Sequence, residues 1–292
     1  MSPSKKTFKC DSILNVPDDS SLLFDFLVLQ SRQVLTECSN NVKLWDSKCK
    51  KCLRVFSGHT NWIWQFKLTT EQNNLLTCSA DKTVKIWNFS TGECKDSLES
   101  HTDWVNYMQI LDNILITGSD DCTIKVWDMN LSKCIRTLTG HNYYVQCIKL
   151  VNSRTLISGS ADRTLKLWSL ESGDCLMNFI GHKNWILCCN VLLNEEIISG
   201  SADNSIKVWD QKTGKCLKTL FGHEDYVCCL KVSKLNEIFS SSKDKTIRVW
   251  CGLTGICKLI IDKHSNCVLS MQLLNDEEFI SGSTDRTLRF WK

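Results

Sequence analysis

Apolar and polar residues alternate in short segments throughout the chain. The most regular segment places a basic residue between two apolar ones and ends in tryptophan, as in 84–87, 124–127, 165–168, 206–209 and 247–250. Successive side chains of a strand point to opposite faces of a sheet, so a period of about two residues predicts strands rather than helices. Both prolines precede residue 20, and Gly, Asn, Asp and Ser supply the turns. The pattern predicts an all-β fold.

The tryptophan that ends this segment marks a repeat. It recurs at steps of 40 to 42 residues, as Trp45, Trp87, Trp127, Trp168, Trp209, Trp250 and Trp291. One copy contains four predicted strands, named a to d in chain order, at 145–150, 155–160, 164–168 and 175–179. Four short strands per repeat without helical periodicity are typical of a propeller blade. We therefore expect residues 1–292 to form a single domain, a seven-bladed β-propeller with four antiparallel strands per blade.

The segment 8–14 is expected to complete the seventh blade. The last repeat stops at Lys292, directly after its strand c, and so has no strand d of its own. The segment 8–14 resembles the strand d segments of other repeats, such as 93–98, and Cys10 falls where six repeats carry a cysteine. Pairing this segment with the last repeat would cover an exposed strand edge and close the ring of blades.

A histidine and an aspartate accompany six of the seven repeat tryptophans. The aspartate follows the histidine by 20 to 22 residues, and the tryptophan follows the aspartate by six. The sets are His59, Asp81 and Trp87; His101, Asp121 and Trp127; His141, Asp162 and Trp168; His182, Asp203 and Trp209; His223, Asp244 and Trp250; and His264, Asp285 and Trp291. This spacing resembles that of the WD-repeat β-propeller family, and the resemblance covers essentially the whole chain.

The resemblance implies that each set forms a hydrogen-bonded tetrad with a Ser or Thr of strand b. A buried imidazole and a buried indole N–H both need acceptors, and we expect the aspartate to serve both of them. The first repeat lacks the histidine, and Ser39 stands six residues before Trp45 in place of the aspartate. We therefore expect the first blade to lack the tetrad and to be the loosest.

Catalytic, metal and cofactor sites are not expected. All six histidines belong to the repeat, so none remains for a triad or a metal site. Six cysteines recur seven residues after a repeat tryptophan, and Cys49 and Cys52 have no second pair at zinc-site spacing. The net charge of +3, spread evenly along the chain, argues against nucleic acid as a partner. Without a signal peptide or a long apolar run, we expect an intracellular protein, cytoplasmic or nuclear, with no membrane partner.

Aromatic residues placed three or five positions after the repeat histidines are the candidate partner-binding residues. They are Trp62, Trp64, Trp104, Tyr144, Trp185 and Tyr226. We expect them to surround the central opening on the face that carries the d–a loops and the b–c turns. Basic residues of the b–c turns favour an acidic or phosphorylated ligand there; they are Lys82, Arg163, Lys243, Lys245 and Arg286. The alternative is that the aromatic side chains only complete the packing between blades and that the basic side chains are solvated.

These features predict a non-catalytic protein-interaction scaffold. The expected partner is a protein or peptide bound on the face of the d–a loops and b–c turns, with the propeller a monomer within a larger complex. The run 214–223 resembles the propellers of F-box/WD-repeat proteins. That resemblance implies an alternative role as the substrate-recognition subunit of a ubiquitin ligase complex.

Overall fold

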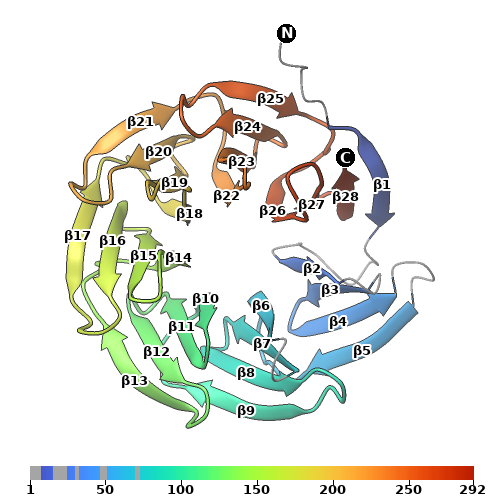
Figure 1. Ribbon diagram of the computed structural model, residues 1–292. Helices are drawn as coiled ribbons and strands as arrows, with labels where there is room; N and C mark the ends of the chain where they lie inside the picture. The colour runs from blue at the N-terminus through green and yellow to red at the C-terminus, as the bar shows by residue number, and fades with distance from the viewer. Residues whose placement is uncertain (1–7, 16–24, 30–32, 47–50, 70–72) are drawn as a thin grey trace.

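The computed structural model describes residues 8–15, 25–29, 33–46, 51–69 and 73–292. Every regular element in these residues is a β-strand, and the strands form seven four-stranded antiparallel sheets around a central axis (Figure 1). The expectation of a seven-bladed all-β propeller is therefore confirmed. Among the described residues there is no helix that could cross a membrane.

The blades follow one another in chain order. The first three contain β2 (Phe26–Val28), β3 (Gln33–Cys38), β4 (Asn41–Asp46) and β5 (Lys51–Ser57); β6 (Ile63–Thr69), β7 (Asn74–Ser79), β8 (Thr83–Asn88) and β9 (Cys94–Glu99); and β10 (Val105–Leu111), β11 (Ile114–Ser119), β12 (Ile124–Asp128) and β13 (Lys133–Leu138). The fourth and fifth contain β14 (Val145–Leu150), β15 (Thr155–Ser160), β16 (Thr164–Ser169) and β17 (Cys175–Ile180); and β18 (Ile186–Val191), β19 (Ile197–Ser201), β20 (Ile206–Trp209) and β21 (Cys216–Leu220). The last two contain β22 (Val227–Val232), β23 (Glu237–Ser242), β24 (Ile247–Cys251) and β25 (Cys257–Ile261); and β26 (Val268–Leu273), β27 (Phe279–Ser283), β28 (Thr287–Trp291) and β1 (Cys10–Asn15).

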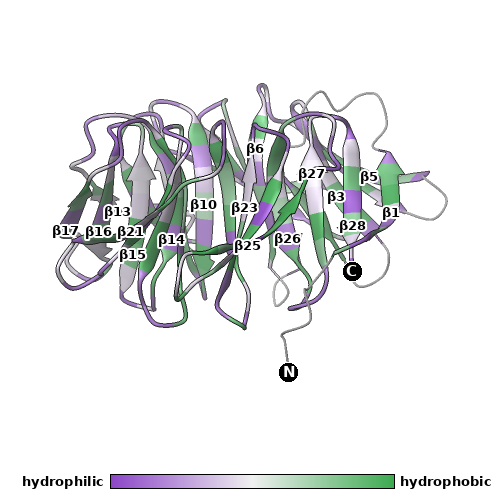
Figure 2. Ribbon diagram, turned by 90° about the horizontal axis from the view of Figure 1, so that it is seen from above, coloured by the Kyte–Doolittle hydropathy of each residue, from purple (hydrophilic) through white to green (hydrophobic). Residues whose placement is uncertain are grey.

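The strands of each blade run between two loop-bearing faces (Figure 2). Strand a lies nearest the axis and strand d on the outer rim, as β14 and β17 do in the fourth blade (Figure 1). Because neighbouring strands are antiparallel, the d–a loops and the b–c turns emerge on one face, and the a–b and c–d turns emerge on the other. We call the first of these the d–a face.

The N-terminal strand closes the last blade. β1 pairs antiparallel with β28, with Ile13 opposite Arg289 and Leu14 opposite Leu288. Phe8 precedes β1 and makes an edge-on contact with Phe279, with ring centroids 5.0 Å apart. The predicted closure is confirmed, and the paired segment begins and ends slightly later than the predicted 8–14.

The hydrophobic core lies between the blades. Six of its clusters each contain one repeat tryptophan, which packs on strands of its own blade and of the preceding blade. Trp87, for example, packs with Ile63 and Phe66 of its own blade and with Leu44 and Phe56 of the first. The tryptophans of the second to seventh blades are each at most 2% exposed. Every blade therefore depends on its neighbours to bury its apolar faces.

The Ser-Gly-Ser run in several strand b segments has a packing role. An added Cβ at Gly159 would lie 2.7 Å from Cys147 Sγ and 2.7 Å from Ile186 Cγ2 of the next blade. At Gly200 the nearest atom, Val227 Cγ1 of the next blade, would be 2.6 Å away. Glycine is required at these positions because strand a of the next blade approaches too closely for a side chain.

Candidate functional site

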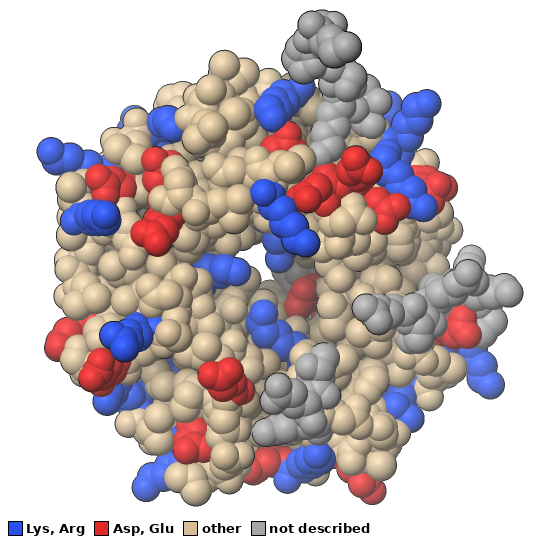
Figure 3. Space-filling model, in the orientation of Figure 1, with Lys and Arg blue, Asp and Glu red and all other residues tan. Residues whose placement is uncertain are grey.

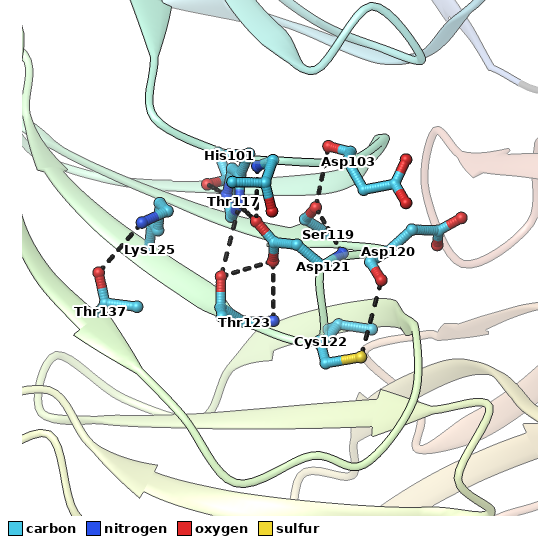
Figure 4. Close-up of polar contacts among 12 residues, drawn as sticks. His101, Asp103, Thr117, Ser119, Asp120, Asp121, Cys122, Thr123, Lys125 and Thr137 are labelled. Atoms are coloured by element: carbon cyan, nitrogen blue, oxygen red, sulfur yellow. Dashed lines mark hydrogen bonds and ion pairs between the residues drawn. The ribbon is translucent and has the colours of Figure 1, made fainter.

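A chain of hydrogen bonds connects four side chains in the third blade, and Figure 4 labels three of them, His101, Thr117 and Asp121. The Nδ1 atom of His101 lies 2.6 Å from Oδ2 of Asp121, and its Nε2 atom lies 2.7 Å from Oγ1 of Thr117. The indole Nε1–H of Trp127 donates to the same threonine hydroxyl at 2.9 Å. A neutral imidazole with its proton on Nδ1 gives each hydrogen one acceptor, so that donors align from the indole to the carboxylate. We call this chain the relay.

The same relay occurs in all six blades that carry the histidine. The Nδ1 to Oδ2 distances are 2.6 to 2.8 Å. The hydroxyl groups that link imidazole to indole belong to Thr77, Thr117, Ser158, Ser199, Ser240 and Ser281. One expected detail is wrong, because the indole donates to this hydroxyl and not to the aspartate. A hydroxyl group both accepts and donates a hydrogen bond, so it can accept from the indole N–H and donate to Nε2 of the imidazole. Within the relay, the carboxylate at the turn accepts only from Nδ1–H, on the other side of the imidazole ring.

The aspartate also fixes the loops of the d–a face. Oδ2 of Asp121 accepts the backbone N–H of Thr102 at 3.1 Å, and its Oδ1 accepts the N–H and the hydroxyl of Thr123 at 2.9 and 2.6 Å. Burial raises the pKa of Asp121, but the hydrogen bonds from His101, Thr123 and Thr102 outweigh it and hold that pKa well below its usual range. Burial lowers the pKa of His101, and Asp121 opposes this only in part. The pair therefore consists of a carboxylate and a neutral imidazole.

The first blade has only the outer half of the relay. Trp45 donates from Nε1 to Oγ1 of Thr36 at 3.0 Å, and no histidine extends the chain further. Its b–c turn is a two-residue hairpin, since Cys38 pairs directly with Asn41 and Ser39 adopts a φ of 56°. The turn is thus one residue shorter than in the other blades, which leaves no position for the aspartate.

The aromatic residues three positions after the histidines are fixed through their main chain. The carbonyl oxygens of Trp62, Trp104 and Trp185 each accept, at 2.8 Å, the N–H that precedes the turn aspartate. The corresponding residues of the other three blades, Tyr144, Tyr226 and Cys267, accept the same bond at 2.9 Å. These residues therefore lie beside the b–c turns, on the d–a face.

The indole rings of that face remain accessible. Trp62, Trp104 and Trp185 are 48%, 40% and 44% exposed. Trp64 is half-buried against the core between the second and third blades, and its ring centroid is 6.0 Å from that of Trp62 and 5.7 Å from that of Trp104. The three indoles form a continuous aromatic cluster, in which Trp64 packs and the other two face solvent.

The two tyrosines of the set are more covered. Tyr144 is half-buried and its ring centroid lies 4.2 Å from that of Tyr143. Tyr226 is also half-buried, and the ammonium group of Lys243 lies 4.4 Å from its ring centroid. Tyr143 is 43% exposed. The repeat pattern did not identify it as a candidate binding residue, because the other blades carry Asn or Asp at its position. We call Trp62, Trp64, Trp104, Tyr143, Tyr144, Trp185 and Tyr226 the aromatic face set.

Basic and acidic side chains lie near the b–c turns of different blades on the d–a face. Exposed residues at one turn position, directly after the aspartate, have φ values of 63 to 75° and belong to four blades; they are Lys82, Arg163, Lys245 and Arg286. In the third blade Asp103 and Asp120 lie near the turn instead (Figure 4). Asp120 accepts a hydrogen bond from Asn106 at 2.6 Å. Burial raises the pKa of Asp120. Four blades thus carry a basic residue at this turn position, and the third blade has acidic residues near its turn.

Comparisons with known proteins agree with this architecture. The family model described as WD40, WD domain, G-beta repeat, matches residues 50–88, 92–128, 132–169, 173–210, 214–251 and 255–292. A solved structure, titled the crystal structure of the WD40 beta propeller domain of Doa1, is 27% identical, with a TM-score of 0.85 over 98% of this chain and 97% of that chain. No curated protein matches the sequence. The repeat model and the shared propeller show that this chain belongs to the WD40 repeat family, whose propellers generally serve as protein-interaction scaffolds.

Proposed function

We propose that this propeller is a non-catalytic scaffold that binds a protein or peptide segment across the d–a face. The observation that carries the proposal is the exposure of Trp62, Trp104 and Trp185, each at least 40%, on a main chain fixed by hydrogen bonds. Tryptophan is enriched among the residues that dominate binding energy at protein interfaces. Because the main chain that carries these side chains is already ordered, binding does not have to order it.

The relays beneath this face support the same proposal. Each relay ties a d–a loop to a b–c turn through the turn aspartate, as Asp81 does with Thr60 N and Thr83 N at 3.1 and 3.0 Å. Six such connections leave the loops little freedom relative to the sheets. A surface fixed in this way suits a scaffold, since partners dock on it with little rearrangement.

The charges suggest how a segment would lie. The exposed indoles of the second and third blades suit an apolar anchor residue of the partner. Lys243 and Lys245 of the sixth blade and Arg163 of the fourth suit acidic side chains further along the segment, whereas Asp103 and Asp120 would repel them at the third blade. An acidic segment with an apolar anchor is therefore the proposed ligand.

The test is the double variant Trp104→Ala and Trp185→Ala, used as bait in quantitative proximity labelling and affinity purification. We expect at least a tenfold loss of the specific partners, because each hot-spot tryptophan contributes about 2 kcal/mol or more. The matched control is Leu131→Ala with Leu253→Ala, which removes exposed apolar side chains from c–d turns on the opposite face. Full retention of all partners by a folded double tryptophan variant would show that the aromatic side chains serve packing only.

The same purification distinguishes the second candidate, a ubiquitin ligase substrate receptor. The resemblance to F-box/WD-repeat propellers would place phosphopeptide contacts directly before the turn aspartates. Lys243 is the one cation among those six residues, so the sixth blade alone supports this role and the other five weaken it. Recovery of cullin-adaptor subunits with the wild-type bait would support that role. Their absence, alongside other specific partners, would favour the scaffold.

A further inference from the structure

The inner strands line the central channel with side chains eight residues after each repeat histidine. In the third, fifth and seventh blades this residue is an amide that bridges to the next blade. Gln109 Nε2 donates to the carbonyl of Ile148 at 3.3 Å, and Asn190 Nδ2 donates to that of Leu230 at 3.2 Å. The Oε1 atom of Gln272 accepts the N–H of Val28 at 3.0 Å. The amides therefore stabilise the ring of blades from inside.

In the second, fourth and sixth blades, the same position carries Lys67, Lys149 and Lys231. All three side chains are half-buried, and within the described ranges no hydrogen bond or ion pair joins their ammonium groups to an acceptor. Burial lowers the pKa of Lys67 to about 8, with Asp25 opposing the shift and the charges of Lys231 and Lys149 adding to it. Burial and the charge of Lys231 also lower the pKa of Lys149. The lysines thus lie close enough to repel one another, a cost that a structural amide would avoid.

The three lysines line one cavity in the channel, with a volume of about 590 Å³. Basic side chains border this central opening in the space-filling view (Figure 3). The volume falls within the range of about 300 to 1,000 Å³ that is typical of small-molecule sites. The pocket is therefore large enough for a compact ligand that touches all three blades.

Carboxylates compensate only part of the positive charge. Asp25 accepts the N–H of Phe26 at 3.0 Å and that of Phe66 at 3.2 Å, so its oxygens are engaged by the main chain. Burial raises the pKa of Asp25 to about 6, against these bonds and the nearby lysines. Asp112 in the β10–β11 turn and Glu195 in the β18–β19 turn are exposed at the rim, where water screens them. Among the described residues that line this cavity, three lysines stand against Asp25 and Asp112, so the cavity has an excess of positive charge.

We infer that the central channel is a binding site for a compact multivalent oxyanion, held by Lys67, Lys149 and Lys231. Each lysine presents a flexible point charge with three donors, which suits clustered phosphate or carboxylate oxygens. An anion at the axis would offset the repulsion among the three ammonium groups and link alternate blades. This site is separate from the aromatic face set and does not depend on the proposed partner.

Isothermal titration calorimetry of the full chain with sodium tripolyphosphate and, separately, with citrate tests the inference. We expect binding that weakens by at least about tenfold in the triple variant Lys67→Gln, Lys149→Gln, Lys231→Gln, because hydrogen bonds to charged groups are lost. Glutamine is chosen because the neighbouring blades already carry an amide at this position. The tighter of the two anions identifies whether phosphate or carboxylate is the preferred source of the oxygens.

The matched control removes three lysines from the outer part of the blades. Lys85, Lys125 and Lys207 of strand c donate to strand d residues at 2.9 to 3.3 Å, and their change to Gln alters the net charge equally. We expect this control to keep the wild-type affinity and Asp25→Asn to bind roughly threefold tighter, since it removes an opposing charge. No binding of either anion at millimolar concentration, or equal loss in the control, would overturn the inference. If the channel triple variant unfolds, Lys231→Gln alone and Asp25→Asn must still shift the affinity in opposite directions.

Discussion

The first blade and the six blades after it bury the repeat tryptophan to different extents. In the six, the repeat tryptophan is at most 2% exposed, and its indole N–H begins a relay that ends on a carboxylate. In the first, Trp45 is only half-buried and its relay stops at Thr36. The cluster between the seventh and first blades, made of Phe26, Val34, Ile280 and Leu288, contains no tryptophan. The deeply buried indoles therefore accompany a complete relay, whereas the half-buried indole of the first blade keeps only the hydrogen bond to the strand b hydroxyl.

The largest expected contrast lies in the tryptophans themselves. Trp168→Ala should reduce the free energy of unfolding by about 3 to 5 kcal/mol, because it empties a filled interface between blades. Trp45→Ala should cost only about 1 to 2 kcal/mol, because less of that side chain is removed from water. Urea unfolding followed by circular dichroism measures both. If the two substitutions lower the free energy of unfolding equally, the blades with a complete relay are not packed better than the first blade.

The turn aspartate gives the next contrast. Asp162→Ala removes the acceptor of His141 Nδ1–H and of two backbone N–H groups, so we expect a loss of about 2 to 4 kcal/mol. Ser39→Ala changes the corresponding turn of the first blade, where the side chain is exposed, and should cost less than about 0.5 kcal/mol. The same urea titration compares them. If Asp162→Ala lowers the free energy of unfolding as little as Ser39→Ala does, the relay does not contribute to the stability of the fold.

The sequence predicted the blades well because the repeat records contacts that recur in each of them. The His, Asp and Trp spacing reports one hydrogen-bonded arrangement six times, and the resemblance of 8–14 to a strand d located the closing strand. The spacing of residues does not indicate which oxygen accepts the indole N–H. The aspartate was therefore expected to accept it, in place of the strand b hydroxyl. Nor does the spacing indicate that the first b–c turn is one residue shorter, which depends on the pairing of Cys38 with Asn41.

The candidate site was only partly predictable. The aromatic face set follows from residues three positions after the histidine, but the different burial of Trp62 and Trp64 depends on the side chains of the next blade. The channel cations were overlooked because Lys67, Lys149 and Lys231 stand in alternate repeats and meet only when the ring closes. Their one signal in the sequence is the alternation of lysine and amide at the eighth residue after the histidine.

The smallest expected effect concerns pH. Burial lowers the pKa of His101, His141 and His264 from the ordinary value of 6.5, so these rings stay neutral in the folded state where the unfolded chain is already protonated. The unfolded state then binds more protons, and the free energy of unfolding falls as pH decreases below about 6.5. Asp25, whose pKa is raised to about 6, and Asp120, whose pKa is also raised, have the opposite sign, because the folded state takes up their protons before the unfolded state does. Three histidines outweigh two aspartates, so we expect a net loss on acidification, and a steeper one in Asp25→Asn.

The most direct test of the central claim, that His101, His141 and His264 are neutral structural members of the relay, is a long-range ¹H–¹⁵N spectrum of the ring nitrogens between pH 7.5 and 5. For His101, His141 and His264 the account predicts a protonated Nδ1 and an unprotonated Nε2, unchanged as the pH passes through 6.5. Rings that carry their proton on Nε2, or that become charged at or above pH 6.5, would contradict it.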